Sequence, residues 1–199
     1  MSNFTHLVQI FYFLLLLKKS NCSLVWYQWP IMWKGVMYEW KELPDGRHET
    51  VYLFGNPIVF WIGLAAIFIS ILCVDQLGFK FLFDKKKPLT VDQSEFLRKV
   101  SYCLLGYFAN LLPYVLVTRP CYMYHYHPSL YFAIFITGIL IDEWLRQPGF
   151  LKYKLLFLLA LMLLVIYAYF HFLPFSYSIP LTNDEHQQRR WFYSFFVHW

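Results

Sequence analysis

The hydrophobic pattern divides the chain into four long apolar stretches, separated by polar or basic connections. Each stretch approaches the ~20 residues that a helix needs to cross ~30 Å of hydrocarbon. Because lipid offers no partner for backbone polar groups, such stretches must be helical. The predicted spans are residues 57–74, 100–118, 128–145 and 155–173. The pattern therefore predicts an all-α fold, that of a polytopic integral membrane protein.

Two of the spans carry local signals. Asn56 can cap the first helix, and Pro57 at its first position lacks the N–H that would otherwise have no partner. The second span contains Pro113, which is expected to kink it. It also contains Asn110, which is expected either to make a polar contact between helices or to reach a substrate cavity.

Residues 1–19 do not fit the pattern of the four spans. The apolar run 7–17 resembles the core of a signal peptide, but no basic residue precedes it and no small-residue cleavage site follows it. The run is also too short to cross a bilayer. We therefore predict an interfacial amphipathic helix or an atypical start segment. Asn3 and Asn21 each begin a glycosylation sequon, whose use the sequence leaves open.

The basic residues indicate how the spans are oriented. Connections 75–99 and 146–154 share one side of the membrane, and the positive-inside rule makes that side cytosolic. Residues 20–56, 118–128 and 174–199 are then expected on the lumenal or exterior side. The basic residues that support this orientation are Lys80, Lys85, Lys86, Lys87, Arg98, Lys99, Arg146, Lys152 and Lys154.

Composition supports a membrane protein. The chain is 59% hydrophobic and 15% charged, whereas soluble domains are nearer ~45–50% apolar and ~25% charged. The net charge of +5 needs no nucleic acid to explain it. The four cysteines have no zinc spacing. Cys73 and Cys103 lie in apolar runs and are expected to pack there, whereas Cys22 and Cys121 would pair only if both face an oxidising lumen.

The strongest candidate chemistry lies in residues 118–132, TRPCYMYHYHPSLYF. Two prolines disfavour a continuous helix, so backbone polar groups must face water or line a cavity. Arg119 lies on the side that disfavours positive charge, and a guanidinium suits bidentate phosphate recognition. The alternatives are a snorkelling arginine, idle surface histidines and an aromatic belt. The candidate residues for an anion such as a lipid phosphate are Arg119, His125, Tyr124, Tyr126 and Asn110.

Other polar and aromatic groups favour structural interpretations. Asp142 and Glu143 form an adjacent acidic pair at the cytosolic foot of the third span, where an ion pair with the basic loop, beside Arg146, is expected rather than catalysis. The tryptophan cluster near residue 30 is interpreted as an interfacial anchor, and an arginine pair in the C-terminal tail as lying against the membrane. The cluster comprises Trp26, Trp29 and Trp33, and the arginine pair is Arg189 and Arg190.

Four motifs occur in a characteristic order: WYQWPIMWKG, VYLFGNPIVFW, LLGYFANLLPYVLVTRPCYMYHYHPSLYF and YSIPLTNDEHQQRRWFYSFF. Together they resemble the C-terminal multi-span region of the protein O-mannosyltransferases. The resemblance implies that residues 20–199 form the C-terminal transmembrane domain of a GT-C type glycosyltransferase fold. Such enzymes of the endoplasmic reticulum membrane move mannose from dolichyl phosphate mannose to Ser or Thr hydroxyls of secretory proteins.

The resemblance also implies partners and a division of labour. The dolichyl-linked donor is a substrate, no bound cofactor is expected, and whether a divalent metal assists is left open. Another mannosyltransferase is the expected homo- or heterodimer partner. Arg119, with His125, would stabilise the donor phosphate or its departure. The family's catalytic Asp-Glu pair belongs to an upstream lumenal loop without a counterpart here, so the isolated chain is expected to be inactive. The alternatives are a non-catalytic truncated membrane partner of a full-length transferase and, less favoured, a small transporter.

The resemblance is incomplete at one position of the candidate segment. The family's usual His-Tyr-Leu-Pro is His125-Tyr126-His127-Pro128 in this sequence. A polar ring therefore stands where an aliphatic side chain is expected, so the resemblance does not define the fine shape of the pocket at this position.

Overall fold

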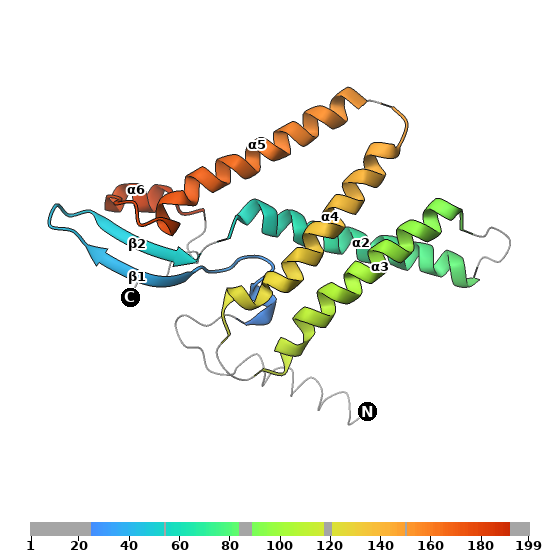
Figure 1. Ribbon diagram of the computed structural model, residues 1–199, viewed down its shortest axis with the longest axis horizontal. Coiled ribbons are helices and arrows are strands. Elements are labelled where there is room, and N and C mark those ends of the chain that lie inside the picture. Colours follow the sequence, from blue (N-terminus) through green and yellow to red (C-terminus); the bar gives the residue numbers. More distant parts are fainter. Residues whose placement is uncertain (1–24, 54, 84–88, 118–120, 150, 192–199) are drawn as a thin grey trace.

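The computed structural model describes residues 25–53, 55–83, 89–117, 121–149 and 151–191 (Figure 1). Four long helices form its body, and a β-hairpin with several short helices gathers at one end. The long helices are α2 (Pro57–Phe83), α3 (Val91–Leu111), α4 (His127–Arg146) and α5 (Leu151–Ser176). The smaller elements are η1 (Trp26–Gln28), β1 (Val36–Glu42), β2 (His48–Leu53), η2 (Leu112–Val115), η3 (Met123–Tyr126) and α6 (Asn183–Gln188).

The helical fold predicted from the hydrophobic pattern is confirmed. α2 and α4 lead away from the hairpin end, and α3 and α5 return to it (Figure 1). Within the described residues, three helices are long and apolar enough to cross a membrane: Pro57–Lys80, Met123–Arg146 and Lys152–Ser176. α3 falls outside this set because its first turns are charged.

The second predicted span, 100–118, has different boundaries in the structure. α3 begins at Val91, where Thr90 and Gln93 form a capping box, and it ends at Leu111. Pro113 does not kink the helix as expected, because it lies in the 3-10 turn η2 that follows. A proline inside an α-helix would leave a carbonyl without its donor and clash with it, so the chain ends the α-helix first.

Small residues let α2, α3 and α4 pack closely. An added Cβ on Gly106 would lie 2.4 Å from the Cε1 atom of Phe132, and one on Gly63 would lie 3.2 Å from the Cβ of Ala133. Membrane helices associate by such close approach, since lipid gives no hydrophobic driving force between them. Cys103 is half-buried in this packing, as the apolar run around it predicted.

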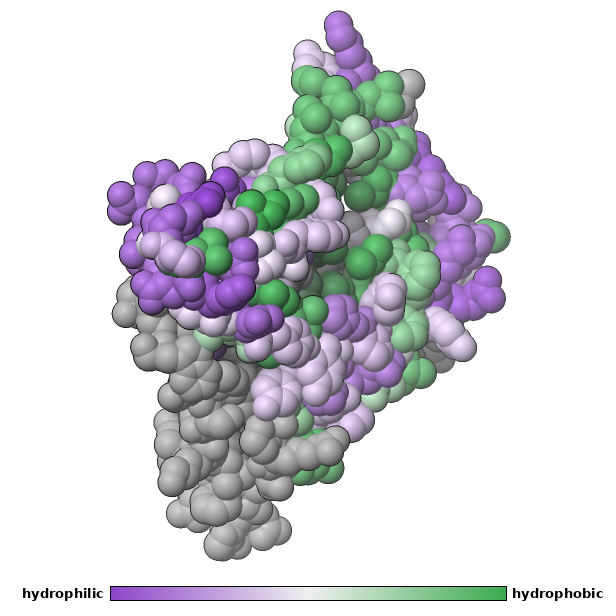
Figure 2. Space-filling view, turned by 60° about the vertical axis from the view of Figure 1, so that its left-hand side comes forward, coloured by the Kyte–Doolittle hydropathy of each residue, from purple (hydrophilic) through white to green (hydrophobic). Residues whose placement is uncertain are grey.

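Asn56 joins α2 to α5. Its Oδ1 accepts from the backbone N–H of Ile58 at 3.1 Å and of Val59 at 3.4 Å, which confirms the predicted cap. Its Nδ2 donates to the carbonyl of Val165 in α5 at 2.9 Å. Much of the remaining α5 surface is apolar and exposed, for example Leu156 at 62% and Phe170 at 63%. Figure 2 shows hydrophobic surface over the long helices and hydrophilic surface over the hairpin end.

The hairpin was not predicted from the sequence. β1 and β2 pair antiparallel with a bulge between Met37 and Glu39. The inner residues of β2 alternate into the core, and its first residue, His48, forms a backbone bridge to Leu181. Tyr52 meets Phe175 of α5 with ring centroids 6.2 Å apart. The hairpin therefore anchors the chain that follows α5.

Candidate functional site

The predicted site segment lies between the ends of α3 and α4, at the hairpin end of the molecule. Residues 116–117 and 121–122 are not helical, and η3 then leads directly into α4. Pro128 lies in the first turn of α4, where its missing N–H leaves no helical bond unmade. The break in the helix predicted from the prolines is therefore confirmed.

Five rings gather around this segment, and we call them the aromatic wall: Trp29, Tyr114, Tyr122, Tyr124 and His125. The imidazole of His125 stacks on Tyr114 at a centroid distance of 5.2 Å and an angle of 28°. Tyr124 lies 4.4 Å from it on a tilted plane. His125 is half-buried, so the rings fix its orientation while part of it stays accessible. A ring held in this way can donate a hydrogen bond, or meet an anion when protonated.

Trp29 is a core residue, and its interpretation as an interfacial anchor is wrong. Its side chain is fully buried, with Tyr114 at 5.0 Å edge-on and His125 at 6.2 Å. Trp33, four residues later, is 45% exposed and remains compatible with that interpretation. Within the described residues the buried Nε1 of Trp29 has no hydrogen-bond acceptor. The ordered motif WYQWP was the available signal, but hydropathy alone could not distinguish a core ring from a surface ring.

Tyr126 is packed between helices, whereas Asn110 is half-buried and bonds within its own helix, not to another helix as was expected. The Tyr126 side chain is fully buried, and its hydroxyl lies 3.2 Å from that of Tyr107. The Ser129 hydroxyl donates to the Tyr107 carbonyl at 3.2 Å. Asn110 donates through Nδ2 to the carbonyl of Gly106, one turn earlier in its own helix. Of the candidates that the structure describes, Tyr124 and His125 are therefore those with accessible surface in the aromatic wall.

Several sequence predictions fall on other parts of the chain. The structure does not describe several of the residues on which they fall. These are Arg119, Pro120, Cys22, the two sequons and the start segment 1–19. Cys121 is buried next to the aromatic wall. The geometry of the predicted anion site is therefore defined here by His125 and the rings that hold it.

Arg189 was expected to lie against the membrane. In the structure, the tail packs on the helices instead. The Nη1 of Arg189 donates to the carbonyl of His171 at 2.7 Å, and the Nε2 of His171 lies 3.2 Å from the carbonyl of Arg189. Trp191 contacts Phe172 at 4.9 Å and Trp61 at 5.9 Å. These contacts join the tail to α5 and α2.

The acidic pair is structural, as predicted. Asp142 accepts from the Nη2 of Arg146 at 2.7 Å, one turn along α4. Both residues lie at the end of α4 that is remote from the aromatic wall (Figure 1). Among the described residues, no group of three or more histidines, cysteines or carboxylates could hold a metal ion.

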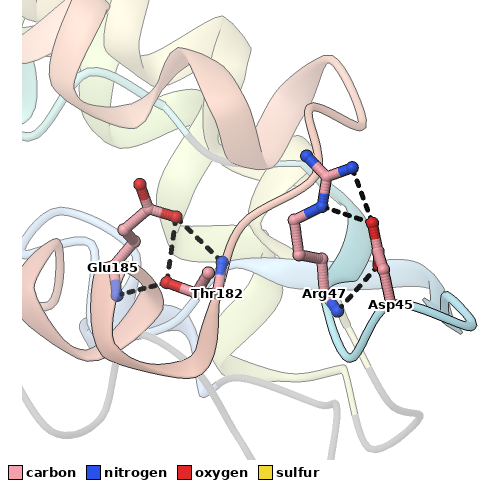
Figure 3. A network of polar contacts seen from close by, with 4 residues as sticks. All are labelled: Asp45, Arg47, Thr182 and Glu185. Carbon is pink, nitrogen blue, oxygen red and sulfur yellow. Dashed lines mark hydrogen bonds and ion pairs between the residues drawn. The ribbon is translucent and has the colours of Figure 1, made fainter.

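An ion pair between Asp45 and Arg47 and a capping box between Thr182 and Glu185 stabilise the turns at the hairpin end (Figure 3). Hydrogen bonds from the side chain and backbone of Arg47 lower the pKa of Asp45. Hydrogen bonds from the backbone N–H and hydroxyl of Thr182 lower the pKa of Glu185, which caps α6 reciprocally. All four groups serve local structure and lie apart from the aromatic wall.

Comparison with known proteins gives one consistent result. Residues 13–195 match the family described as the C-terminal four TMM region of protein-O-mannosyltransferase. Protein O-mannosyl-transferase 2 of Danio rerio is 29% identical over 80% of this chain and 22% of its own length. Dolichyl-phosphate-mannose–protein mannosyltransferase 1 of Saccharomyces cerevisiae is 29% identical over 82% of this chain and 20% of its own length.

A solved structure shares the fold. It is the S. cerevisiae protein O-mannosyltransferase Pmt1-Pmt2 complex bound to the sugar donor, and the likeness has a TM-score of 0.75 at 25% identity. The likeness covers 92% of this chain and 24% of the matching chain. In each of the three comparisons, this chain spans about a quarter or less of the relative's own length. The shared fold and the family match over residues 13–195 agree. The chain therefore belongs to the protein O-mannosyltransferase family, in which it corresponds to the C-terminal four-span region.

Proposed function

We propose that the chain supplies the C-terminal membrane region of a protein mannosyltransferase of the endoplasmic reticulum. In this proposal mannose moves from dolichyl phosphate mannose to Ser or Thr hydroxyls of secretory proteins, and the chain works as a dimer with another mannosyltransferase. The observation that carries the proposal is the fold shared with a complex solved with its sugar donor. The S. cerevisiae relative is named for the same donor, dolichyl phosphate mannose.

The aromatic wall is proposed as one side of the donor site. His125 is held in a fixed orientation by Tyr114 and Tyr124 and keeps accessible surface. Arg119 belongs to the same connection between α3 and α4. When dolichyl phosphate leaves, negative charge develops on the phosphate, and preorganised donors in a site of low dielectric stabilise that charge best. Arg119 and His125 therefore stabilise the leaving group, while the general base comes from the acidic lumenal loop that the family resemblance implies.

A chimera tests this proposal. Residues 20–195 replace the matching region of the S. cerevisiae relative, and transfer of labelled mannose to a Ser/Thr peptide is measured in microsomes. Arg119→Ala and His125→Ala should each lower kcat by about 10²-fold or more, as expected for loss of one charge-stabilising donor. Lys152→Ala, which removes an exposed cation at the opposite end of the helices, is the matched control. Wild-type turnover in Arg119→Ala would end the donor-site assignment.

A second candidate function is that of a non-catalytic membrane partner of a larger transferase. It is favoured by the exposed apolar surface of α5, which includes Leu156 and Phe170. Helices of a partner can cover such a surface through packing contacts. Two results together would favour this function over the first: co-purification of a larger transferase with the tagged chain, and no mannose transfer by the chimera.

A further inference from the structure

A groove between α3 and α4 lies outside the proposed donor site. Its volume is about 450 Å³, and its lining comprises Arg98, Lys99, Tyr102, Cys103 and Ile139. That volume falls in the range of ~300–1,000 Å³ that is typical of ligand sites. The groove lies toward the start of α3, whereas the aromatic wall follows the end of that helix. The two features therefore belong to opposite ends of the membrane region.

The charged end of the groove lies at the depth of lipid headgroups. Asp75 is 18 residues beyond Pro57 in α2, and Asp142 is 15 residues beyond His127 in α4. At ~1.5 Å per residue these distances are about 27 and 23 Å, close to the ~30 Å of hydrocarbon. Lys99 lines a small pocket together with Asp142 and so shares its level.

The apolar end of the groove is one helical turn deeper. Tyr102 and Cys103 follow Lys99 at a spacing of three and four residues, which places them on the same side of α3. Tyr102 is 75% exposed, and Ile139 of α4 lines the groove opposite α3. The groove thus combines a cationic end at headgroup depth with an apolar body inside the hydrocarbon.

The charges of the lining are of one sign, since it contains two cations and no carboxylate. Lys99 is paired with Glu95 at 2.6 Å. Arg98 is exposed and makes no hydrogen bond or ion pair within the part of the chain that the structure describes. Its guanidinium is therefore available for a phosphate, which it can bind through two parallel hydrogen bonds.

We propose that this groove binds one glycerophospholipid with an anionic headgroup, drawn from the leaflet at the end of the helices that carries the basic connections. Arg98 binds the phosphate, and an acyl chain lies over Tyr102, Cys103 and Ile139. A free phosphate would leave the apolar body unfilled, and an apolar partner helix would bury Arg98 without a counter-charge. A phospholipid satisfies both ends. The proposal does not depend on transferase activity.

Native mass spectrometry of the full chain tests the proposal. The chain is reconstituted in bilayers of equal parts palmitoyl-oleoyl phosphatidylcholine and phosphatidylserine, extracted in mild detergent, and scored for retained lipid. Wild type should retain one phosphatidylserine in preference to phosphatidylcholine. Arg98→Gln should lower that retention about fivefold, the effect expected for one basic residue at an anionic headgroup. Lys152→Gln, an exposed cation on α5 outside the groove, should leave it unchanged.

Two results would overturn the proposal. Equal losses in Arg98→Gln and Lys152→Gln would mean general surface attraction without a site. Displacement of the lipid by soluble glycerophosphoserine as effectively as by a short-chain phosphatidylserine would mean that the apolar body contributes nothing. Ile139→Trp provides a second variant that fills the apolar body and keeps both cations. It should reduce retention of phosphatidylserine, and full retention in that variant would also contradict the proposal.

Discussion

Lys154 is predicted to hold the turn between α4 and α5 together. Its side chain is only 5% exposed. The ammonium group donates to the carbonyls of Trp144 at 2.8 Å and Leu145 at 3.2 Å, and also to that of Gln147. α4 ends at Arg146, so the carbonyls of Leu145 and Gln147 lie where no following helical turn supplies donors, whereas the Trp144 carbonyl also accepts from the backbone N–H of Gln147 at 3.3 Å. The cation also complements the negative end of the helix dipole.

Replacing Lys154 with methionine keeps most of the apolar stem and removes the donor. A hydrogen bond to a charged group contributes ~1.5–3 kcal/mol, and a buried acceptor left without a donor costs ~1–3 kcal/mol. The three bonds share one ammonium and are not additive, so we expect a total loss of about 2–4 kcal/mol. For a chain of this length that loss corresponds to a decrease in Tm of about 4–16 °C.

Thermal stability in detergent, followed by size-exclusion chromatography of a fluorescent fusion, measures this effect. Lys152→Met is the matched control, because Lys152 is exposed two residues earlier on the same helix. It should shift the Tm by ~1 °C or less, since surface substitutions change stability little. If the Tm of Lys154→Met equals that of the Lys152 control, the reasoning that the buried ammonium satisfies the end of α4 is refuted.

Three further predictions use the same preparation. Gly106→Ala should destabilise the chain by about 1–3 kcal/mol, because the new Cβ would meet Phe132 at 2.4 Å. The control Gly138→Ala should be neutral or stabilising, because its Cβ meets no atom within 4 Å. Equal Tm values for the two variants would contradict the packing argument. Asn56→Ala should lower the free energy of unfolding by about 1–3 kcal/mol, because it removes the α2 cap and the bond to α5. Asn56→Asp should keep the cap and recover part of that loss. Equal Tm values for both variants and wild type would disprove the roles of Asn56 in the cap and in the bond to α5. The depressed pKa of Glu185 makes the stabilisation from its cap complete above the ordinary value of 4.5, and this stabilisation is lost as pH falls through the folded-state value. The protection factors of the α6 amides, corrected for the intrinsic exchange rate at each pH, should therefore fall in acid for wild type. An identical fall in Glu185→Gln would exclude this group as the cause.

The lengths of the apolar runs made the membrane helices predictable, because the bilayer requires both the length and the helical backbone. The cap at Asn56 and the ion pair of Asp142 with Arg146 were also predictable, since both are made by neighbours in the sequence. The end of α3 was predicted poorly. Hydrophobicity continues to residue 118, but the α-helix ends at Leu111 and Pro113 lies in the 3-10 turn that follows.

The candidate site divides in the same way. The prolines and polar rings of residues 118–132 identified the segment, but they gave no basis for separating Tyr126 from Tyr124. Helix packing decided that point, because it buries Tyr126 against Tyr107 and leaves Tyr124 at the surface. Trp29 was misassigned for the same reason, since its contacts with Tyr114 and His125 join residues about 85–96 positions apart.

What the sequence determined by itself is what depends on short spacing: span length, caps, the broken segment and the sign of the charges in each connection. The tertiary structure decided the contacts between distant residues. It placed the hairpin against the end of α5, docked Arg189 on His171 and brought α3 and α4 together around Gly106. Such contacts depend on the shape of both surfaces at once, and hydropathy along one chain carries no information about how two apolar faces interlock.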